Sequence, residues 1–302
     1  MNVVRAKVLG FCMGVRRAVD LTSMEARKGT GKVYTLGPLI HNPRVLAELK
    51  EIGAPSVNSL DEIKKLNKNC SVVIRAHGVK PSTEIELHNI GAYVVDATCP
   101  NVKASQLKAE ELARAGYCLF LAGEANHAEI EGIIGYAHSG GLSADLYSCF
   151  CEAVSNAAEA GKAAKKLYGI NSNAKTALIG QTTISEKEYL AISEAVRMFF
   201  PNLEVINAIC LATKERQDAL RDLLDLVDGV IIAGGKESAN TRRLFAIAKE
   251  SGKPSVLIED ASEISIELSK EFLKLKTIGL CAGASTPDSV IDEIETKLAA
   301  IG

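Results

Sequence analysis

The stretch AYVVDATCPNVKASQLKAEEL, residues 92–112, shows how the chain is built. It begins with a short apolar run rich in Val, passes through Cys99 and Pro100, and continues with apolar residues at helical spacing. A short apolar run is typical of a buried parallel strand, and Pro favours the first turn of a helix. We therefore expect a strand that ends just before Cys99 and a helix that begins just after it.

Two other stretches have the same order of strand, cysteine and helix. AKVLGFC (6–12) is followed by MGVRRAVDLTSM (13–24), and LEVINAIC (203–210) is followed by LATKERQDALRDLL (211–224). Cys12, Cys99 and Cys210 therefore hold equivalent positions, which predicts three similar α/β units that each contribute one cysteine. Because ligands of open parallel sheets bind beyond the carboxyl ends of the strands, we expect the three thiols to surround a common centre.

The rest of the chain repeats the alternation of strands and helices, which is typical of α/β proteins with parallel sheets. Strands are expected at 3–10, 33–37, 71–76, 92–97, 117–123, 176–180, 203–209, 228–235, 254–260 and 276–283. Helices are expected at 14–28, 43–52, 81–89, 101–115, 151–167, 185–200, 213–226, 238–251 and 286–300. We divide the chain into three lobes, residues 13–98, 99–208 and 209–302, and expect the N-terminal strand in 1–12 to join the third lobe.

The charge balance and the N-terminal sequence limit the partners and the compartment. There are 35 Lys and Arg against 37 Asp and Glu, a net charge of −2, whereas nucleic-acid-binding proteins usually have a basic surface. Basic residues interrupt the first 20 positions, and no apolar run is long enough to span a membrane. We therefore predict a cytoplasmic protein, with neither nucleic acid nor membrane as a partner, whose cysteines are reduced.

Polar residues cluster just after several predicted strands. A strand end followed by small residues and a helix start offers backbone N–H groups and hydroxyls to an anion such as a phosphate. Helix capping alone would also explain the Ser, Thr and Asn residues, but three histidines at such positions favour the anion site. The residues are His41, His77, His127, Thr182, Ser238, Asn240 and Ser285. Glu129, two residues after His127, is a candidate proton donor or simply a first-turn helix residue.

The three equivalent cysteines fit an iron–sulfur cluster better than zinc, whose cysteine ligands usually lie close together in sequence. A four-iron cluster with three cysteines has one iron without a protein ligand, which can bind a substrate oxygen. The remaining cysteines are interpreted as structural, although Cys149 and Cys151 form a weak Cys-x-Cys metal signal. These residues together predict a redox-active iron–sulfur enzyme that acts on a small phosphorylated hydroxyl compound.

Eight motifs, in order along nearly the whole chain, resemble the 4-hydroxy-3-methylbut-2-enyl diphosphate reductase family. They are GFCMGV, His41-Asn42, RAHGV, DATCP, NHAEIEG, QTTIS, ICLATKERQ and AGASTPD. The resemblance implies a cytoplasmic oxidoreductase of the methylerythritol phosphate route to isoprenoids, with three α/β lobes around a central [4Fe–4S] cluster. The expected reaction is reductive dehydroxylation of the allylic diphosphate to isopentenyl and dimethylallyl diphosphate. The expected electron donor is a ferredoxin or flavodoxin.

The resemblance also implies a role for each matching residue. Cys12, Cys99 and Cys210 would be the cluster ligands, and Glu129, Thr182 and His127 would act in catalysis. The diphosphate would be held by His41, His77, His127, Ser238, Asn240 and Ser285. Ala239 departs from the family pattern, which usually has Ser there.

Two alternatives remain open. One is a related three-cysteine iron–sulfur synthase or dehydratase, which would take a carboxylate substrate. The other is a non-catalytic iron–sulfur redox sensor or electron carrier, which would leave the strand-end histidines and threonines without a purpose.

Overall fold

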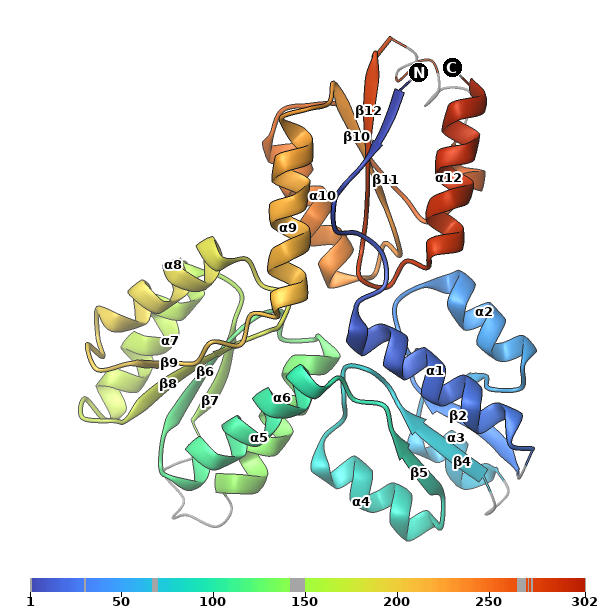
Figure 1. The fold of residues 1–302 in the computed structure, drawn as a ribbon. Helices are drawn as coiled ribbons and strands as arrows, with labels where there is room; N and C mark the ends of the chain where they lie inside the picture. The colour runs from blue at the N-terminus through green and yellow to red at the C-terminus, as the bar shows by residue number, and fades with distance from the viewer. Residues whose placement is uncertain are drawn as a thin grey trace. The chain divides into compact units, whose positions relative to one another are not determined.

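The computed structural model describes residues 2–29, 31–66, 70–141, 150–264, 270, 272 and 274–301. Within these residues the chain forms three parallel four-stranded sheets, with helices between successive strands (Figure 1). The predicted α/β class with three small parallel sheets is therefore confirmed.

Each sheet is named here after its most buried long strand. In spatial order, the β10 sheet consists of β1 (Asn2–Arg5), β12 (Thr277–Ala282), β10 (Gly229–Ala233) and β11 (Ser255–Ile258). The β4 sheet consists of β3 (Ser56–Val57), β2 (Lys32–Leu36), β4 (Cys70–Ile74) and β5 (Tyr93–Asp96). The β6 sheet consists of β7 (Cys151–Val154), β6 (Cys118–Ala122), β8 (Thr176–Gly180) and β9 (Glu204–Val205).

The helices that the structure describes lie mostly where the apolar periodicity predicts them. They are α1 (Met13–Arg27), α2 (Pro43–Glu51), α3 (Leu60–Lys65), α4 (Pro81–Ile90), α5 (Pro100–Arg114), α6 (Ala128–Gly141), α7 (Ala157–Ile170), α8 (Glu186–Arg197), α9 (Leu211–Leu224), α10 (Ala239–Glu250) and α12 (Asp288–Ile301), with a 3-10 turn η1 (Ala261–Glu263). Among the described helices, none has both the length and the apolar character that crossing a membrane requires.

The central strands are buried along their whole length, because helices cover both faces of a parallel sheet. Every residue of β4, β6, β8 and β10 is buried. In β6, Phe120 packs into the cluster formed with α7 and α8, whereas Leu119 and Leu121 pack into the one formed with α5 and α6. Successive side chains of a strand point to opposite faces, so apolar residues at every position supply both cores.

The chain separates into two compact units. The first comprises residues 1–19, 40–55 and 211–302, and it contains the β10 sheet. The second comprises residues 20–39 and 56–210, and it contains the β4 and β6 sheets. In the first unit β1 pairs with β12, so the N-terminal strand lies in the same sheet as residues 277–282.

The helix predicted at 151–167 is wrong in its first part. Residues Cys151–Val154 form the edge strand β7, and helix α7 begins only at Ala157. The Asn156 side chain caps α7 by accepting a hydrogen bond of 3.0 Å from the backbone N–H of Glu159. This cap sets the start of α7. The weak Cys-x-Cys metal signal includes Cys149, which lies outside the described residues.

Helix α6 does not appear among the predicted helices, because it contains four glycines and Gly has a poor helix propensity. Close packing explains two of them. A Cβ at Gly140 would lie 2.3 Å from the carbonyl oxygen of Glu110 on α5, and one at Gly132 would lie 2.6 Å from Nε2 of Gln106. Tertiary packing of α6 against α5 therefore outweighs the local propensity.

Candidate active site

The predicted site residues of the first unit gather beyond the carboxyl ends of β1, β10 and β12. The backbone N–H of Cys12 donates to the carbonyl of Ala284 at 3.1 Å, which places the cysteine beside the loop that follows β12. In that loop the hydroxyl of Ser285 donates to the carbonyl of His41 at 3.2 Å. The structure thus brings Cys12, Ser285 and the His41 segment together within this unit.

Ser238 and Asn240 lie at the start of α10, directly after β10. The Ser238 hydroxyl caps α10 by accepting from the backbone N–H of Thr241 at 3.4 Å, so the capping alternative applies to this residue. Asn240 is 4% exposed, and neither side-chain amide atom has a hydrogen-bond partner among the residues that the structure describes. A buried amide without partners is rare in native proteins and points to a ligand-binding role.

Gly235 lets the loop after β10 approach the loop that carries His41. A Cβ at this position would lie 2.1 Å from the His41 carbonyl oxygen, which is far inside van der Waals contact. Only glycine permits this approach, so the local sequence GGKES positions the start of α10 next to the His41 backbone.

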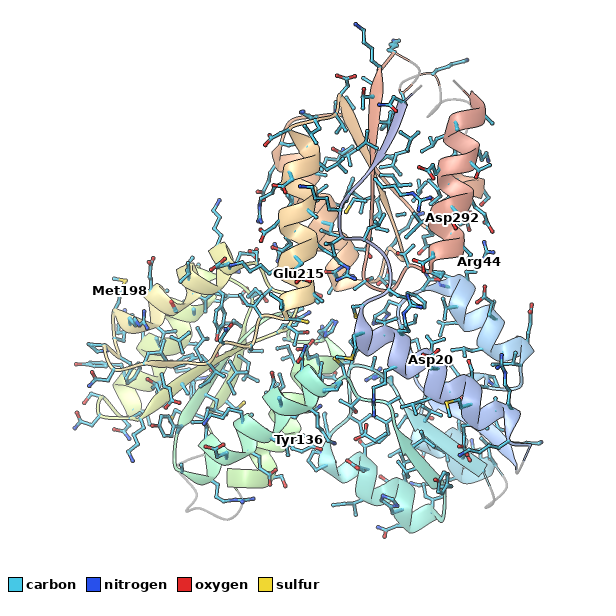
Figure 2. The ribbon with its side chains drawn as sticks, viewed as in Figure 1. Asp20, Arg44, Tyr136, Met198, Glu215 and Asp292 are labelled. Carbon is cyan, nitrogen blue, oxygen red and sulfur yellow. The ribbon has the colours of Figure 1, made fainter. Side chains whose placement is uncertain are left out.

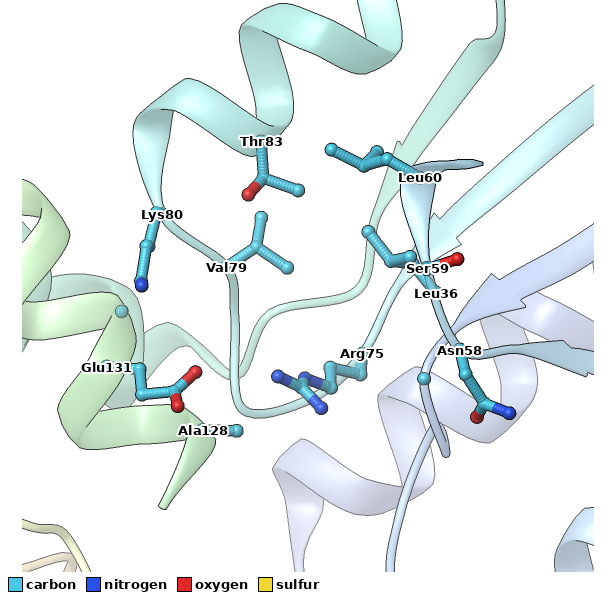
Figure 3. Close-up of a pocket in the computed structure, with 12 residues that line it drawn as sticks. Leu36, Asn58, Ser59, Leu60, Arg75, Val79, Lys80, Thr83, Ala128 and Glu131 are labelled. Carbon is cyan, nitrogen blue, oxygen red and sulfur yellow. The ribbon is translucent and has the colours of Figure 1, made fainter. Parts of the chain in front are cut away.

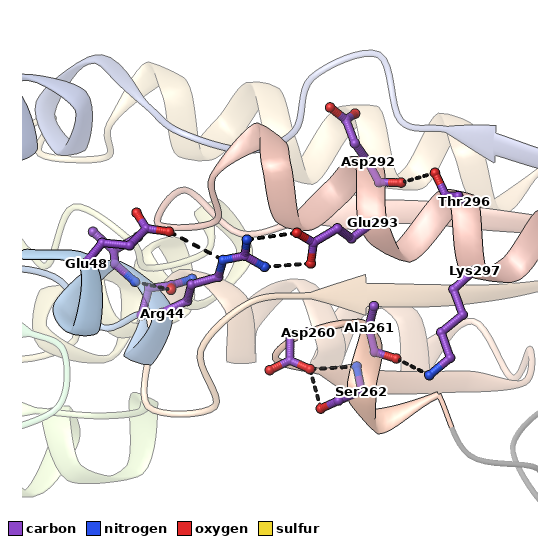
Figure 4. Close-up of polar contacts among 11 residues, drawn as sticks. Arg44, Glu48, Asp260, Ala261, Ser262, Asp292, Glu293, Thr296 and Lys297 are labelled. Atoms are coloured by element: carbon purple, nitrogen blue, oxygen red, sulfur yellow. Dashed lines mark hydrogen bonds and ion pairs between the residues drawn. The ribbon is translucent and has the colours of Figure 1, made fainter. Parts of the chain in front are cut away.

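The helix that follows His41 is fixed to α12. Asn42 caps α2 by accepting from the backbone N–H of Val45 at 3.2 Å. Arg44 then forms a bidentate ion pair with Glu293 on α12, with N–O distances of 2.5 and 2.8 Å (Figure 4). These contacts hold the His41 turn relative to the β10 sheet.

Arg216 on α9 holds the segment before Cys12, a role that no motif in the sequence indicates. Its Nε and Nη2 atoms donate to the carbonyl oxygen of Gly10 at 3.2 and 2.7 Å, and its side chain is buried. The backbone two residues before Cys12 is therefore fixed by a guanidinium from the same unit.

In the second unit, His77 follows β4, Cys99 follows β5 and His127 follows β6. The backbone N–H of Cys99 donates to the carbonyl of Ala76 at 2.9 Å, next to His77. The rings of His77 and His127 meet edge to face, with centroids 5.2 Å apart. His77 and His127, two of the residues predicted at strand ends, therefore lie next to each other in this unit.

Glu129 and Thr182 form the most tightly bonded pair of the predicted site residues. The backbone N–H of Thr182 donates to Oε1 of Glu129 at 2.7 Å, and its hydroxyl donates to Oε2 at 3.0 Å. The backbone N–H of Glu129 donates to Nδ1 of His127 at 3.2 Å, which fixes the imidazole. Glu129 is indeed in the first turn of α6, but it is also buried and bonded across the unit.

The environment of Glu129 favours its protonated form. Burial raises the pKa of this carboxyl to about 7, and the two hydrogen bonds from Thr182 oppose the shift. A carboxyl group with a pKa near neutrality can both hold and release a proton at physiological pH, as a general acid requires.

Cys210 is hydrogen-bonded to two other segments of the second unit. Its backbone N–H donates to the carbonyl of Thr182 at 3.0 Å, and its Sγ accepts from Nδ2 of Asn101 at 3.1 Å. Asn101 is the second residue of α5, and Cys99 directly precedes that helix. Contacts therefore run from Cys99 through α5 to Cys210, Thr182 and Glu129.

A polar network supports the DATCP loop that delivers Cys99. Asp96 accepts from the backbone N–H of Thr98 at 2.9 Å and pairs with Lys103 at 3.1 Å. Lys103 also donates to the hydroxyl of Tyr136 on α6 at 2.9 Å. Tyr136 is labelled in Figure 2. These partners raise the pKa of Lys103, although burial opposes the shift, so its charge is kept.

The sulfur atoms of two predicted ligands accept hydrogen bonds. The Sγ of Cys12 accepts from the backbone N–H of Val15 at 3.4 Å, and that of Cys210 accepts from Asn101. In contrast, burial raises the pKa of the Cys118 thiol and raises that of Cys281 to about 12, which keeps both protonated. None of the described cysteines forms a disulfide, so Cys12, Cys99 and Cys210 can supply the thiolates of an iron–sulfur group.

A separate pocket of about 230 Å³ lies in the second unit, between the end of β4 and the start of α6. The guanidinium of Arg75 and the carboxylate of Glu131 point toward one another there, with Lys80 beside them (Figure 3). Burial lowers the pKa of Arg75, and the charge of Glu131 opposes this shift. None of the predicted site residues lines this pocket.

Comparison with known proteins gives a consistent match over the full length. Residues 3–299 match the family described as LytB protein. A Treponema denticola protein named 4-hydroxy-3-methylbut-2-enyl diphosphate reductase is 45% identical over 302 residues, which is 99% of each chain. A protein of the same name from Aquifex aeolicus is 36% identical over 99% of this chain and 96% of its own length.

Two solved structures are similar to the chain. One, described as (E)-4-hydroxy-3-methyl-but-2-enyl diphosphate reductase, the terminal enzyme of the non-mevalonate pathway, is 36% identical with a TM-score of 0.69 over 99% of both chains. The other, E-1-hydroxy-2-methyl-but-2-enyl-4-diphosphate reductase from Plasmodium falciparum, is 24% identical. It has a TM-score of 0.85 over 98% of this chain and 87% of its own, which supports the fold alone.

Proposed function

Because the chain belongs to the LytB family, we propose that it reduces 4-hydroxy-3-methylbut-2-enyl diphosphate to isopentenyl and dimethylallyl diphosphate. The family that the sequence motifs predict is confirmed, and so is the class of enzyme, an oxidoreductase of isoprenoid biosynthesis. In the proposed reaction the allylic C–O bond breaks and the oxygen leaves as water. Two electrons and two protons enter, one proton going to the water and one to carbon.

The family implies an iron–sulfur cofactor, and we propose a [4Fe–4S] cluster held by Cys12, Cys99 and Cys210. Each of these cysteines lies between a strand and a helix N-terminus, where the helix dipole favours a thiolate. When bound, such a cluster supplies single electrons and a Lewis-acidic iron. A cytoplasmic ferredoxin or flavodoxin is the proposed source of the electrons.

Glu129 is the proposed proton donor, and its buried carboxyl, bonded through both oxygens to Thr182, is the observation that carries the proposal. A carboxyl with a pKa of about 7 holds a proton at neutral pH and can transfer it to the leaving oxygen. Thr182 bonds both carboxylate oxygens, and its hydroxyl is placed to relay the proton. His127 fixes the start of α6 through the N–H of Glu129.

The diphosphate is proposed to bind His, Ser and Asn side chains rather than a cluster of Lys and Arg. The proposed residues are His41, His77, His127, Ser238, Asn240 and Ser285. The unpartnered amide of Asn240 supports this, because an amide N–H that bonds an anion removes the cost of burying it unpaired. Ala239 is the first residue of α10, so its methyl group replaces one hydroxyl at that helix start.

Anaerobic purification followed by iron and sulfide counting and by a dye assay tests the proposal. The protein should oxidise a reduced viologen dye only when the allylic diphosphate is added. Replacing Cys12, Cys99 or Cys210 by Ser should lower the iron content, whereas Cys70→Ser, at a buried cysteine, should not. Dye oxidation with a carboxylate but not with the diphosphate would favour the synthase alternative. Full iron without any substrate response would favour a redox sensor.

A further inference from the structure

Asn101 makes a side-chain contact to a cysteine that lies 109 positions further along the chain. Its Nδ2 atom donates to the Sγ of Cys210 at 3.1 Å, and both residues belong to the second unit. Asn101 follows Cys99 by only two residues, so one short segment carries a predicted ligand and a donor to another predicted ligand.

Both ends of this contact are held by backbone structure. The backbone N–H of Cys210 bonds the carbonyl of Thr182 at 3.0 Å, and that of Lys103 bonds the carbonyl of Cys99 at 2.9 Å. The Ser105 hydroxyl donates to the carbonyl of Asn101 at 3.3 Å within α5. The amide group therefore reaches the sulfur from a helix rather than from a loop.

An amide N–H directed at a cysteine sulfur stabilises negative charge on that sulfur. When an iron–sulfur cluster gains an electron, part of the added charge falls on its sulfur ligands, so such hydrogen bonds raise the reduction potential. We propose that Asn101 is a positioning residue that raises the cluster's reduction potential through its N–H···S bond to Cys210. This inference rests on the proposed function, because it requires Cys210 to be a cluster ligand.

Comparison with the hydrogen-bond donor to Cys12 shows why the identity of residue 101 can change the reduction potential. Cys12 Sγ accepts from the backbone N–H of Val15 at 3.4 Å, and most residues at position 15 would supply the same N–H. The bond to Cys210 depends on the identity of a side chain. Asn101 is exposed, so water partly replaces a lost donor and limits the size of the effect.

The experiment compares the midpoint potential of the one-electron cluster couple in the anaerobic holoenzyme and its variants. Asn101→Leu removes the donor at nearly constant shape, and Asn101→Asp replaces it by a negative acceptor. Asn89→Leu is the matched control, because Asn89 is an exposed residue of α4 in the same unit whose side chain has no hydrogen bond to another described residue. Potentials are set with dithionite and mediator dyes, and the reduced cluster is counted by electron paramagnetic resonance.

We expect Asn101→Leu to lower the ratio of reduced to oxidised cluster about three- to tenfold at the wild-type midpoint potential. A tenfold change corresponds to about 59 mV for a one-electron couple. Asn101→Asp should shift the potential further in the same direction, and Asn89→Leu should leave it unchanged. Resonance Raman bands of the iron–thiolate bonds should change in both Asn101 variants and not in the control.

An unchanged potential in Asn101→Leu with full iron content would overturn the inference, as would an equal shift in Asn89→Leu. If Asn101→Leu does not keep the cluster, Asn101→Ala removes the same donor without added bulk and is judged by the same criterion. Cys210→Ser separates the two proposals. Full iron in that variant refutes Cys210 as a ligand, whereas iron loss there with an unchanged Asn101→Leu potential refutes only the role of Asn101.

Discussion

One predicted site residue in each unit, Glu129 in the second and Asn240 in the first, shows a different way of holding a buried polar side chain. In the second unit, Glu129 is buried and both of its carboxylate oxygens accept hydrogen bonds from Thr182. In the first unit, Asn240 is also buried, but its amide atoms have no partner in the described part of the chain. The proposed proton donor is held in place by fixed partners, whereas the proposed diphosphate-binding amide retains its bonding capacity.

This difference has an energetic side. An unsatisfied buried amide destabilises the folded protein by about 1–3 kcal/mol, which ligand binding can recover. A carboxyl that accepts hydrogen bonds contributes to the stability of the folded protein. Its substitution costs more stability, because the donors that bond it lose their acceptor as well. Substitutions in the second unit should therefore disturb chemistry and stability together, and those in the first unit should separate them.

The largest effect is expected from Glu129→Gln. This change keeps the shape of the side chain but removes the transferable proton, so turnover in the viologen assay should fall about 10²–10⁴-fold. Iron content should stay at the wild-type level, because Glu129 is not a proposed cluster ligand.

Glu131→Gln is the control for this prediction. Glu131 lies on the same helix but lines the Arg75 pocket and makes no contact with Thr182. Its variant should keep turnover within about twofold of wild type. Near-normal turnover in Glu129→Gln would contradict the proton-donor role, and with it the proposed contrast between Glu129 and Asn240.

The second prediction concerns the dependence of stability on pH. The folded-state pKa of Glu129 is raised from 4.5 to about 7, so the folded protein keeps this proton at pH values where the unfolded chain has lost it. The free energy of unfolding should therefore fall by about 3 kcal/mol as pH rises from 4.5 to 7, and then level off. Urea unfolding of wild type and of Glu129→Gln across this pH range measures the free energy of unfolding of each. The fall that Glu129 causes should be absent in the variant. Parallel curves for the two proteins would show that Glu129 is ionised throughout.

Sequence alone could predict the strand–cysteine–helix units, because each is local and combines an apolar run, a cysteine and a helix start. It could also predict that His77, Cys99 and Glu129 follow strands. It could not predict that Asn101 reaches Cys210, because the two residues are 109 positions apart and the contact depends on how the start of α5 lies against the segment that ends at Cys210. Helix α6 was not predicted for a similar reason. Gly132 and Gly140 allow α6 to pack closely against α5, and this tertiary contact is not visible in the sequence.

The third prediction concerns Asn240→Leu, which replaces an unsatisfied amide by an apolar side chain of similar size. Substrate affinity should fall about tenfold to a hundredfold, because a hydrogen bond to a charged group is worth about 1.5–3 kcal/mol. Stability should be unchanged or higher, since a buried polar group without partners is removed. Dissociation constants from titration calorimetry and urea midpoints measure the two quantities.

Thr182→Val is the counterpart in the second unit. It removes the hydroxyl that bonds Oε2 of Glu129, so stability should fall by about 1–3 kcal/mol and the pKa of Glu129 should rise further. If Asn240→Leu destabilises the protein as much as Thr182→Val does, the amide of Asn240 is satisfied in solution and the proposed contrast between the units fails.

The smallest effect is expected from Arg44→Met, which removes the ion pair between α2 and α12. The pair is bidentate, but the side chains of Arg44 and Glu293 are 38% and 47% exposed, so water screens their attraction. The loss of stability should be about 0.2–1 kcal/mol and should shrink further at high salt. A double-mutant cycle with Glu293→Gln measures the coupling directly. Because His41 is also held through Gly235 and Ser285, substrate affinity should change less than twofold. A tenfold loss of affinity in Arg44→Met would mean that the first unit, like the second, depends on bonded side-chain partners to place its binding residues.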